Sequence, residues 1–177
     1  MVRLIMVSIL VVGFCATPLP ATGKETRTMA QLQISSPAFD HQKAMPARFT
    51  CDAQDVNPPL QISNVPAGTT SLALILYDPD APAGMWVHWV LWNISPETRE
   101  ISENSVPAGA VQGLNDWKKN RYGGPCPPSG THRYFFRIYA LDTTLNLAPT
   151  TTKAGLERAI QAHIMATGEL MGTYRRR

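Results

Sequence analysis

Two carboxylates and a histidine gather in one short stretch of this sequence. Asp78 and Asp80 flank Pro79, and His88 follows inside a second apolar run. Residues two positions apart on extended backbone face the same side, so the two carboxylates can lie together. Charges this close repel each other and raise the pKa of one carboxyl group unless a cation lies nearby. We therefore expect His88, and His132 further along the chain, to lie beside the carboxylates in one polar binding site.

The residues around this stretch predict the strands that position it. The runs 72–76 and 86–90 are short, apolar on both alternating sides and bounded by turn residues, which is typical of buried central strands. Pro79 fixes φ and lacks an amide donor, and Pro82 is a candidate for a cis peptide bond. One buried strand should therefore end in a stiff kink that carries both carboxylates, and His88 should return beside it.

A loop rich in glycine and proline, at 122–130, leads into a third apolar run at 134–141. Gly123 and Gly124 let backbone N–H groups approach a ligand closely, while the neighbouring prolines keep the loop rigid. His132 lies at the start of the third run, where binding groups are often mounted on a rigid scaffold. Protonated imidazole and free N–H groups suit phosphate oxygens, whereas carboxylates suit an amine or a protonated phosphate hydroxyl.

In their order and spacing these motifs resemble the phosphatidylethanolamine-binding protein (PEBP) or Raf kinase inhibitor-like family, and most of all its bacterial branch. The motifs are DPDAP at 78–82, HWV at 88–90, GGPCPP at 123–128 and HRY at 132–134. The resemblance runs from about residue 34 to the C-terminus, and it implies a small pocket for phosphorylated head groups or other small anions. The ligand-binding residues that it implies are Asp78, Asp80, Trp86, His88, Tyr122, Gly124, Pro125, Cys126, Pro127, His132 and Tyr134.

The order of the elements predicts a mainly β fold. The one good helix is expected at 152–166, where apolar residues recur at helical spacing and Gly168 follows in the usual C-cap position. Shorter strands are expected at 32–34, 46–50, 60–62 and 170–174. We therefore expect an antiparallel β-sandwich with one peripheral C-terminal helix, which the resemblance also implies.

Length and composition favour a single domain with a lightly charged surface. The 177 residues are 44% hydrophobic and 16% charged, which is enough for a sizeable core. Part of the net charge of +3 belongs to the tail at 175–177, and no basic stripe with interleaved aromatics indicates nucleic acid. We predict one PEBP-like domain over 31–177, without nucleic-acid binding. Segment 115–121 is predicted to be an exposed loop, His41 a surface residue and His163 a helix-face residue.

The N-terminal segment has the layout of a secretory signal peptide. Arg3 precedes an apolar run at 4–14 that is too short to span a bilayer comfortably. We predict a signal peptide over 1–22, cut somewhere within 16–23, and a flexible mature N-terminus over 23–30. The protein would then be exported, periplasmic or extracellular, and its mature form would have no transmembrane span.

The chain has three cysteines, and export decides what is expected of them. Cys15 leaves with the signal peptide or, in the alternative reading, carries a lipid anchor. Phe14 argues against the anchor, because a lipoprotein cleavage site needs a small residue there. Cys51 and Cys126 then remain as a pair in an exported protein, which predicts a disulfide between them. Two buried free thiols are the alternative.

The sequence favours a binding protein over an enzyme, with no cofactor, no bound metal and no catalytic residue. Two hydrolase alternatives stay open. One uses the histidines and carboxylates around a metal, although no third histidine or His-x-x-x-His pair supports it. The other uses Cys126 as a thiol nucleophile with His132 as its base. The resemblance also allows a regulatory or inhibitory role towards a protein partner, and a homodimer is open as well.

Overall fold

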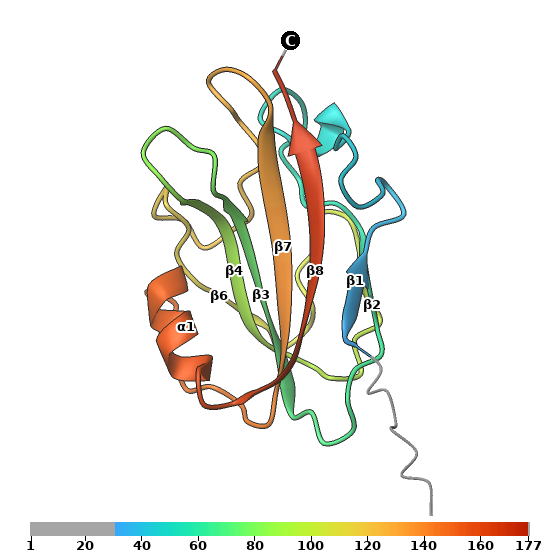
Figure 1. Cartoon of the computed structure of the whole chain (residues 1–177). Helices are drawn as coiled ribbons and strands as arrows, with labels where there is room; N and C mark the ends of the chain where they lie inside the picture. The colour runs from blue at the N-terminus through green and yellow to red at the C-terminus, as the bar shows by residue number, and fades with distance from the viewer. Residues whose placement is uncertain (1–30, 177) are drawn as a thin grey trace, which may run out of the picture.

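The structure is a computed structural model, and it describes residues 31–176 as two antiparallel sheets and one α-helix (Figure 1). The predicted signal peptide and flexible N-terminus lie outside the described residues. The smaller sheet has the strand order β1-β2-β5 and the larger one β6-β4-β3-β7-β8. The elements are β1 (Gln33–Ser35), η1 (Ala47–Phe49), β2 (Leu60–Ser63), β3 (Ser71–Asp78), β4 (Trp86–Ile94), β5 (Glu100–Ile101), β6 (Val111–Gln112), β7 (His132–Leu141), α1 (Lys153–Ile160) and β8 (Ile164–Tyr174).

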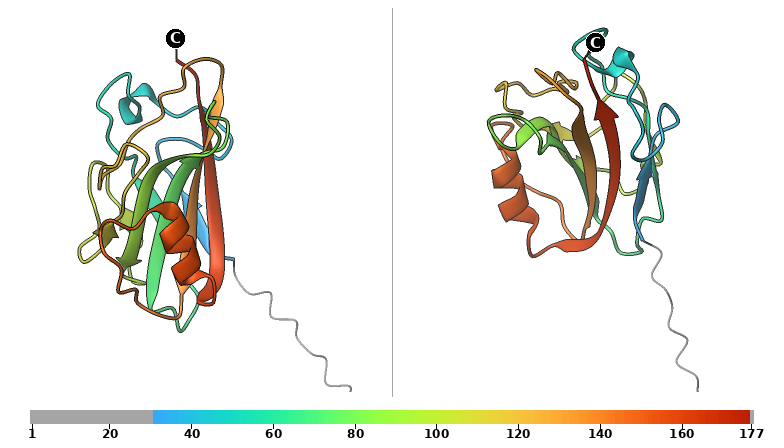
Figure 2. Two further views of the ribbon diagram at one scale, coloured as in Figure 1. Left: turned by 90° about the vertical axis from the view of Figure 1, so that its left-hand side faces the viewer. Right: turned by 45° about the horizontal axis from the view of Figure 1, so that its top comes forward.

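The larger sheet lies between the smaller sheet and the helix, as the two views of Figure 2 show. Apolar side chains such as Leu60 and Phe136 fill the space between the sheets. On the other face, Leu156 and Ile160 of α1 pack against the sheet around Trp92. Burial on both faces explains why the central strands are apolar throughout. The predicted β-sandwich with a peripheral helix is confirmed.

The antiparallel pairing of β3 and β7 creates the place where polar groups meet. All eight residues of β3 are buried, and Tyr77 near its end pairs with Phe135 near the start of β7. Asp78, the last residue of β3, therefore lies beside His132, the first residue of β7. Three strands, β4, β5 and β6, and their loops separate these two residues in the sequence, and the sheet brings them together.

The predicted C-terminal helix is only half right. Helix α1 ends at Ile160, and β8 begins at Ile164 and pairs with β7 along almost its whole length. His163 is thus in the turn between them and not on a helix face. Gly168 is no C-cap but a mid-strand residue, where a Cβ would lie 2.5 Å from the carbonyl oxygen of Leu32. Glycine is needed there so that β1 can approach β8.

Two local expectations are also wrong. Segment 46–50 was expected to be extended, but it forms a single 3₁₀ turn in which Thr50 donates both its N–H and its hydroxyl to the carbonyl of Ala47. Pro46 starts this turn with the φ that proline favours. The peptide bond before Pro82 is trans, as no cis bond occurs within the described residues.

Candidate functional site

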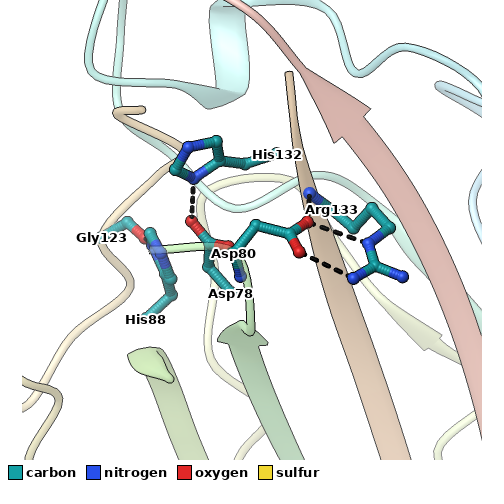
Figure 3. A network of polar contacts seen from close by, with 6 residues as sticks. All are labelled: Asp78, Asp80, His88, Gly123, His132 and Arg133. Atoms are coloured by element: carbon teal, nitrogen blue, oxygen red, sulfur yellow. Dashed lines mark hydrogen bonds and ion pairs between the residues drawn. The ribbon is translucent and has the colours of Figure 1, made fainter. Parts of the chain in front are cut away.

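Asp78 ends β3 and is buried, with 3% of its surface exposed. Its Oδ1 accepts a hydrogen bond from the backbone N–H of Asp80 at 2.8 Å, which closes a tight turn across Pro79. Its Oδ2 accepts a hydrogen bond from Nδ1 of His132 at 2.7 Å (Figure 3). One carboxylate therefore joins the end of β3, the turn that follows it and the start of β7.

Asp80 points away from Asp78 and pairs with Arg133 (Figure 3). Arg133 donates to it through Nε at 2.9 Å, through Nη2 at 2.7 Å and through the backbone N–H at 2.9 Å. Hydrogen bonds from Arg133 hold the pKa of Asp80 below its usual value. The two carboxylates thus have separate partners, and Arg133 is a member of the site that the sequence analysis did not single out.

His88 is almost fully buried in β4, with 2% of its surface exposed. Its Nδ1 lies 2.7 Å from the carbonyl oxygen of Gly123, and since a carbonyl can only accept, Nδ1 carries the proton. The rings of Trp117 and Tyr134 pack edge-on against the imidazole, at centroid distances of 5.1 and 5.3 Å. Burial lowers the pKa of His88 and outweighs the Gly123 carbonyl and Asp78, which act in the opposite direction. Neutral His88 then presents Nε2 as an acceptor.

The glycine–proline loop at 122–130 accepts a hydrogen bond from His88, but the amides of Gly123 and Gly124 already have partners. The N–H of Gly123 donates to the backbone oxygen of His88 at 3.1 Å, and that of Gly124 donates to Oδ1 of Asp55 at 2.6 Å. A Cβ at Gly124 would lie 2.4 Å from the carbonyl oxygen of Phe49, so glycine is required for this close approach. The expectation that these two amides are free for a ligand is wrong, because protein atoms already use them.

A disulfide between Cys51 and Cys126 fixes the loop at its other end. The N–H of Cys51 also donates to the backbone oxygen of Pro125 at 3.1 Å, so two bonds run in parallel between the same segments. Pro127 is buried next to them. The predicted disulfide is confirmed, and the sulfur of Cys126 is therefore not free to serve as a thiol nucleophile.

Tyr134 contributes the last polar group, from the inner face of β7. Its side chain is fully buried, and its hydroxyl makes no well-aligned hydrogen bond among residues 31–176, although the carboxylate of Asp78 lies close to it. Burial, together with the neighbouring charge of Asp78, raises the pKa of Tyr134, so the hydroxyl keeps its proton. A buried hydroxyl without a partner costs free energy, which leaves this donor open to a ligand.

The motifs that meet at this strand end also decide the family. The sequence profile described as Phosphatidylethanolamine-binding protein matches residues 35–175. This chain belongs to the PEBP family. A UPF0098 protein of Methanothermobacter thermautotrophicus is 45% identical over 150 residues, which are 82% of this chain and 99% of the relative. UPF0098 proteins of Chlamydia are 42% identical over 148 residues, so the relatives are archaeal as well as bacterial.

Solved structures agree with the PEBP assignment. A putative PEBP homolog from Chlamydia trachomatis superposes with a TM-score of 0.80 at 41% identity, covering 83% of this chain and 99% of that one. YbcL of E. coli, described as a new member of the mammalian PEBP family, has a TM-score of 0.78 at 30% identity and covers 84% of this chain and 100% of its own. The resemblance read from the motifs is confirmed for both family and fold.

The two aromatic lining residues Tyr122 and Trp86, which the PEBP resemblance implied, differ from each other in role. The hydroxyl of Tyr122 donates to the backbone oxygen of Phe49 at 2.7 Å, and its ring packs edge-on against Trp89. Both ends of Tyr122 are engaged, so it supports the loop and offers no group to a ligand. Trp86 lies edge-on to Trp117 at 5.4 Å, and its buried indole N–H has no partner in the described part of the chain. Trp86 therefore remains a donor beside the site.

Segment 115–121 is not simply the exposed loop that was predicted. Asn115 is buried, and its side-chain amide bonds backbone groups within the segment. Asp116 accepts a backbone N–H of β4 at 2.7 Å. This turn carries Trp117 over His88, with 39% of the tryptophan exposed. The sequence did contain the signal, since an aromatic residue directly follows two residues that favour side-chain-capped turns.

A cavity of about 160 Å³ lies next to the site without belonging to it. Its lining includes Trp117, Gly123 and Gly124 together with both disulfide cysteines, but neither Asp78 nor His88. Gly123 and Trp117 also contact His88, so the cavity adjoins the histidine.

Proposed function

We propose that this PEBP-family chain is an exported binding protein that holds a small phosphorylated or similar anionic head group beside Asp78, His88 and Tyr134. The observation that carries the proposal is the buried hydroxyl of Tyr134, which, like the indole N–H of Trp86, makes no well-aligned hydrogen bond among the described residues. Buried polar groups are normally satisfied, so such a donor favours a ligand at this place. Export rests on the signal-peptide pattern of the N-terminal segment.

Each side chain has a separate role in this proposal. Tyr134 donates its O–H to a ligand oxygen, and His88 offers Nε2 to a donor on the ligand. Asp78 faces the same place and also holds His132 and the turn after β3. Trp86 and Trp117 supply an aromatic wall, which suits the apolar part of a head group.

No helix among the described residues is long and apolar enough to cross a membrane.

Binding is favoured over hydrolysis by the chemistry of the same residues. The sulfur of Cys126 is tied up in the disulfide, which removes the thiol alternative. Within residues 31–176, no three side chains of His, Cys, Asp or Glu are grouped as metal ligands would be. His88 and Tyr134, the groups left for a ligand, are those of a recognition site.

Calorimetric titration with phosphoethanolamine at mildly acidic pH tests the proposal. Tyr134→Phe removes one oxygen atom and no packing volume, so we expect roughly tenfold weaker binding from the lost hydrogen bond. His88→Ala should weaken binding at least as much. His41→Ala, which changes an exposed histidine, is the control and should bind like the wild type. Equal affinity in all four proteins, or no binding to any of them, would show that this is not the binding site.

A further inference from the structure

The polar atoms around Asp78 and His88 include more acceptors than donors. Each oxygen of Asp78 accepts one hydrogen bond from the protein, which leaves further lone pairs on both. The carbonyl of Gly123 fixes a proton on Nδ1 of His88. In the neutral ring the other nitrogen, Nε2, is then a second acceptor. A ligand that fits this place has to bring hydrogen-bond donors of its own.

The nitrogen donors of Arg133 and His132, close to these acceptors, are already engaged. The guanidinium of Arg133 donates to Asp80, and the Nδ1–H of His132 donates to Asp78. Among residues 31–176, the donors at this place that make no well-aligned hydrogen bond are the O–H of Tyr134 and the indole N–H of Trp86, and neither carries a charge. Among the residues that the structure describes, the charged groups that act on His88 are Asp78 and Asp116, and both would repel a doubly charged ligand.

The charged groups that face His88 also disfavour a doubly charged ligand. Asp78 approaches it from β3 and Asp116 from the loop after β6, and both are carboxyl groups. From β7, Tyr134 packs against the ring, and His132 lies behind Asp78. A phosphoryl dianion would place two more negative charges beside these carboxylates. A phosphoryl group with one P–OH carries a single charge and can donate to the open acceptor.

We infer that the site binds a phosphoryl group in its singly protonated form, with the P–OH hydrogen donated to Nε2 of His88 and an unprotonated oxygen accepting from Tyr134. The inference rests on the proposed function and adds the protonation state of the ligand. It also separates phosphate esters from sulfate esters. A sulfate ester has the same tetrahedral shape and the same single charge on its acid group, but that sulfate group has no proton to donate.

Phosphoethanolamine and ethanolamine O-sulfate form the matched pair of ligands for the test. At pH 5.5 we expect the sulfate ester to bind at least about tenfold more weakly, because its sulfate group leaves Nε2 of His88 without a donor. A phosphate monoester loses its second proton near pH 6. The affinity for phosphoethanolamine should therefore fall on the order of a hundredfold between pH 5.5 and pH 8. Equal binding of the two esters overturns the inference.

A second phosphoryl ligand shows whether the proton belongs to the ligand or to the protein. Methylphosphonate loses its second proton at higher pH than a phosphate monoester does. The midpoint of its affinity loss should therefore lie at correspondingly higher pH. If both ligands lose affinity around one common pH, the titrating group belongs to the protein and the inference is wrong. If neither phosphoryl ligand binds at any pH, the proposed function fails together with it.

His88→Gln tests the role of the histidine acceptor. A glutamine amide can present either an oxygen acceptor or an N–H donor, so the variant should bind the two ethanolamine esters within about threefold of each other. His163→Ala is the matched control and should keep the preference of the wild type. A His88→Gln protein that still rejects the sulfate ester would place the discrimination elsewhere. Should this variant fail to fold, the comparison of the two esters on the wild type decides the question.

Discussion

Two histidine–aspartate pairs lie at opposite ends of β7. At its start, Nδ1 of His132 lies 2.7 Å from Oδ2 of Asp78, and just past its end, Nδ1 of His163 lies 2.8 Å from Oδ1 of Asp142. The distances are almost the same, but the burial is not. The first pair has side-chain exposures of 9% and 5%, and the second pair 42% and 54%.

The difference shows that contact distance does not identify a functional pair. Around the buried pair, Asp78 also holds the N–H of Asp80 and lies beside the open hydroxyl of Tyr134. Breaking a buried pair leaves one polar partner stranded away from water, whereas exposed pairs contribute little and are screened by salt. Substitutions at the buried start of β7 should therefore cost more stability than substitutions at its exposed end.

The largest effect is expected where a covalent bond supports the buried end. Replacing Cys51 and Cys126 by serine should lower the free energy of unfolding by about 4 kcal/mol, because the disulfide closes a loop with a sequence separation of 75. The same variant should bind phosphoethanolamine more weakly, since the loop that carries the Gly123 carbonyl loses one anchor. Urea unfolding and calorimetry measure both effects. Unchanged stability and affinity would mean that the hydrogen bonds to the loop suffice without the disulfide.

The sequence predicted the structure at the buried start of β7 better than the structure at its exposed end. The apolar runs identified β3, β4 and β7, and their pairing was enough to bring Asp78, His88 and His132 together. Periodicity failed for β8, where Gly168 and Gly172 occupy two of the inward-facing positions and hide the alternation. Without side chains there, the apolar residues before Gly168 fit a helix as well as a strand. His163 was placed on that helix for this reason.

Long-range side-chain contacts were beyond reach for a different reason. Asp55 reaches the amide of Gly124 across 69 residues, and Arg133 reaches Asp80 across 53. Nothing in local spacing indicates such partners, because both depend on how loops from different strands meet. The sequence therefore predicted free amides at Gly123 and Gly124, although in the fold each already donates a hydrogen bond to a protein oxygen.

Removing the acidic partner tests the comparison directly. Asp78→Ala should lower the free energy of unfolding by roughly 3 kcal/mol, since it strands His132 and the N–H of Asp80 at a buried place. Asp142→Ala is the matched change at the other end of β7 and should cost far less. Chemical denaturation of both variants gives the two values. Equal losses would mean that burial does not distinguish the pairs.

The smallest effect is expected within the exposed pair itself. A double-mutant cycle of His163→Ala and Asp142→Ala should give a coupling energy of about 0.2–1 kcal/mol at low salt, because both side chains stay in contact with water. High salt should reduce this coupling further by screening. The backbone bonds of this turn, from His163 to Ile160 and from Asp142 to His163, survive both substitutions. The cycle therefore isolates the side-chain contact, and a salt-independent coupling above about 2 kcal/mol would place this pair in the same class as the buried one.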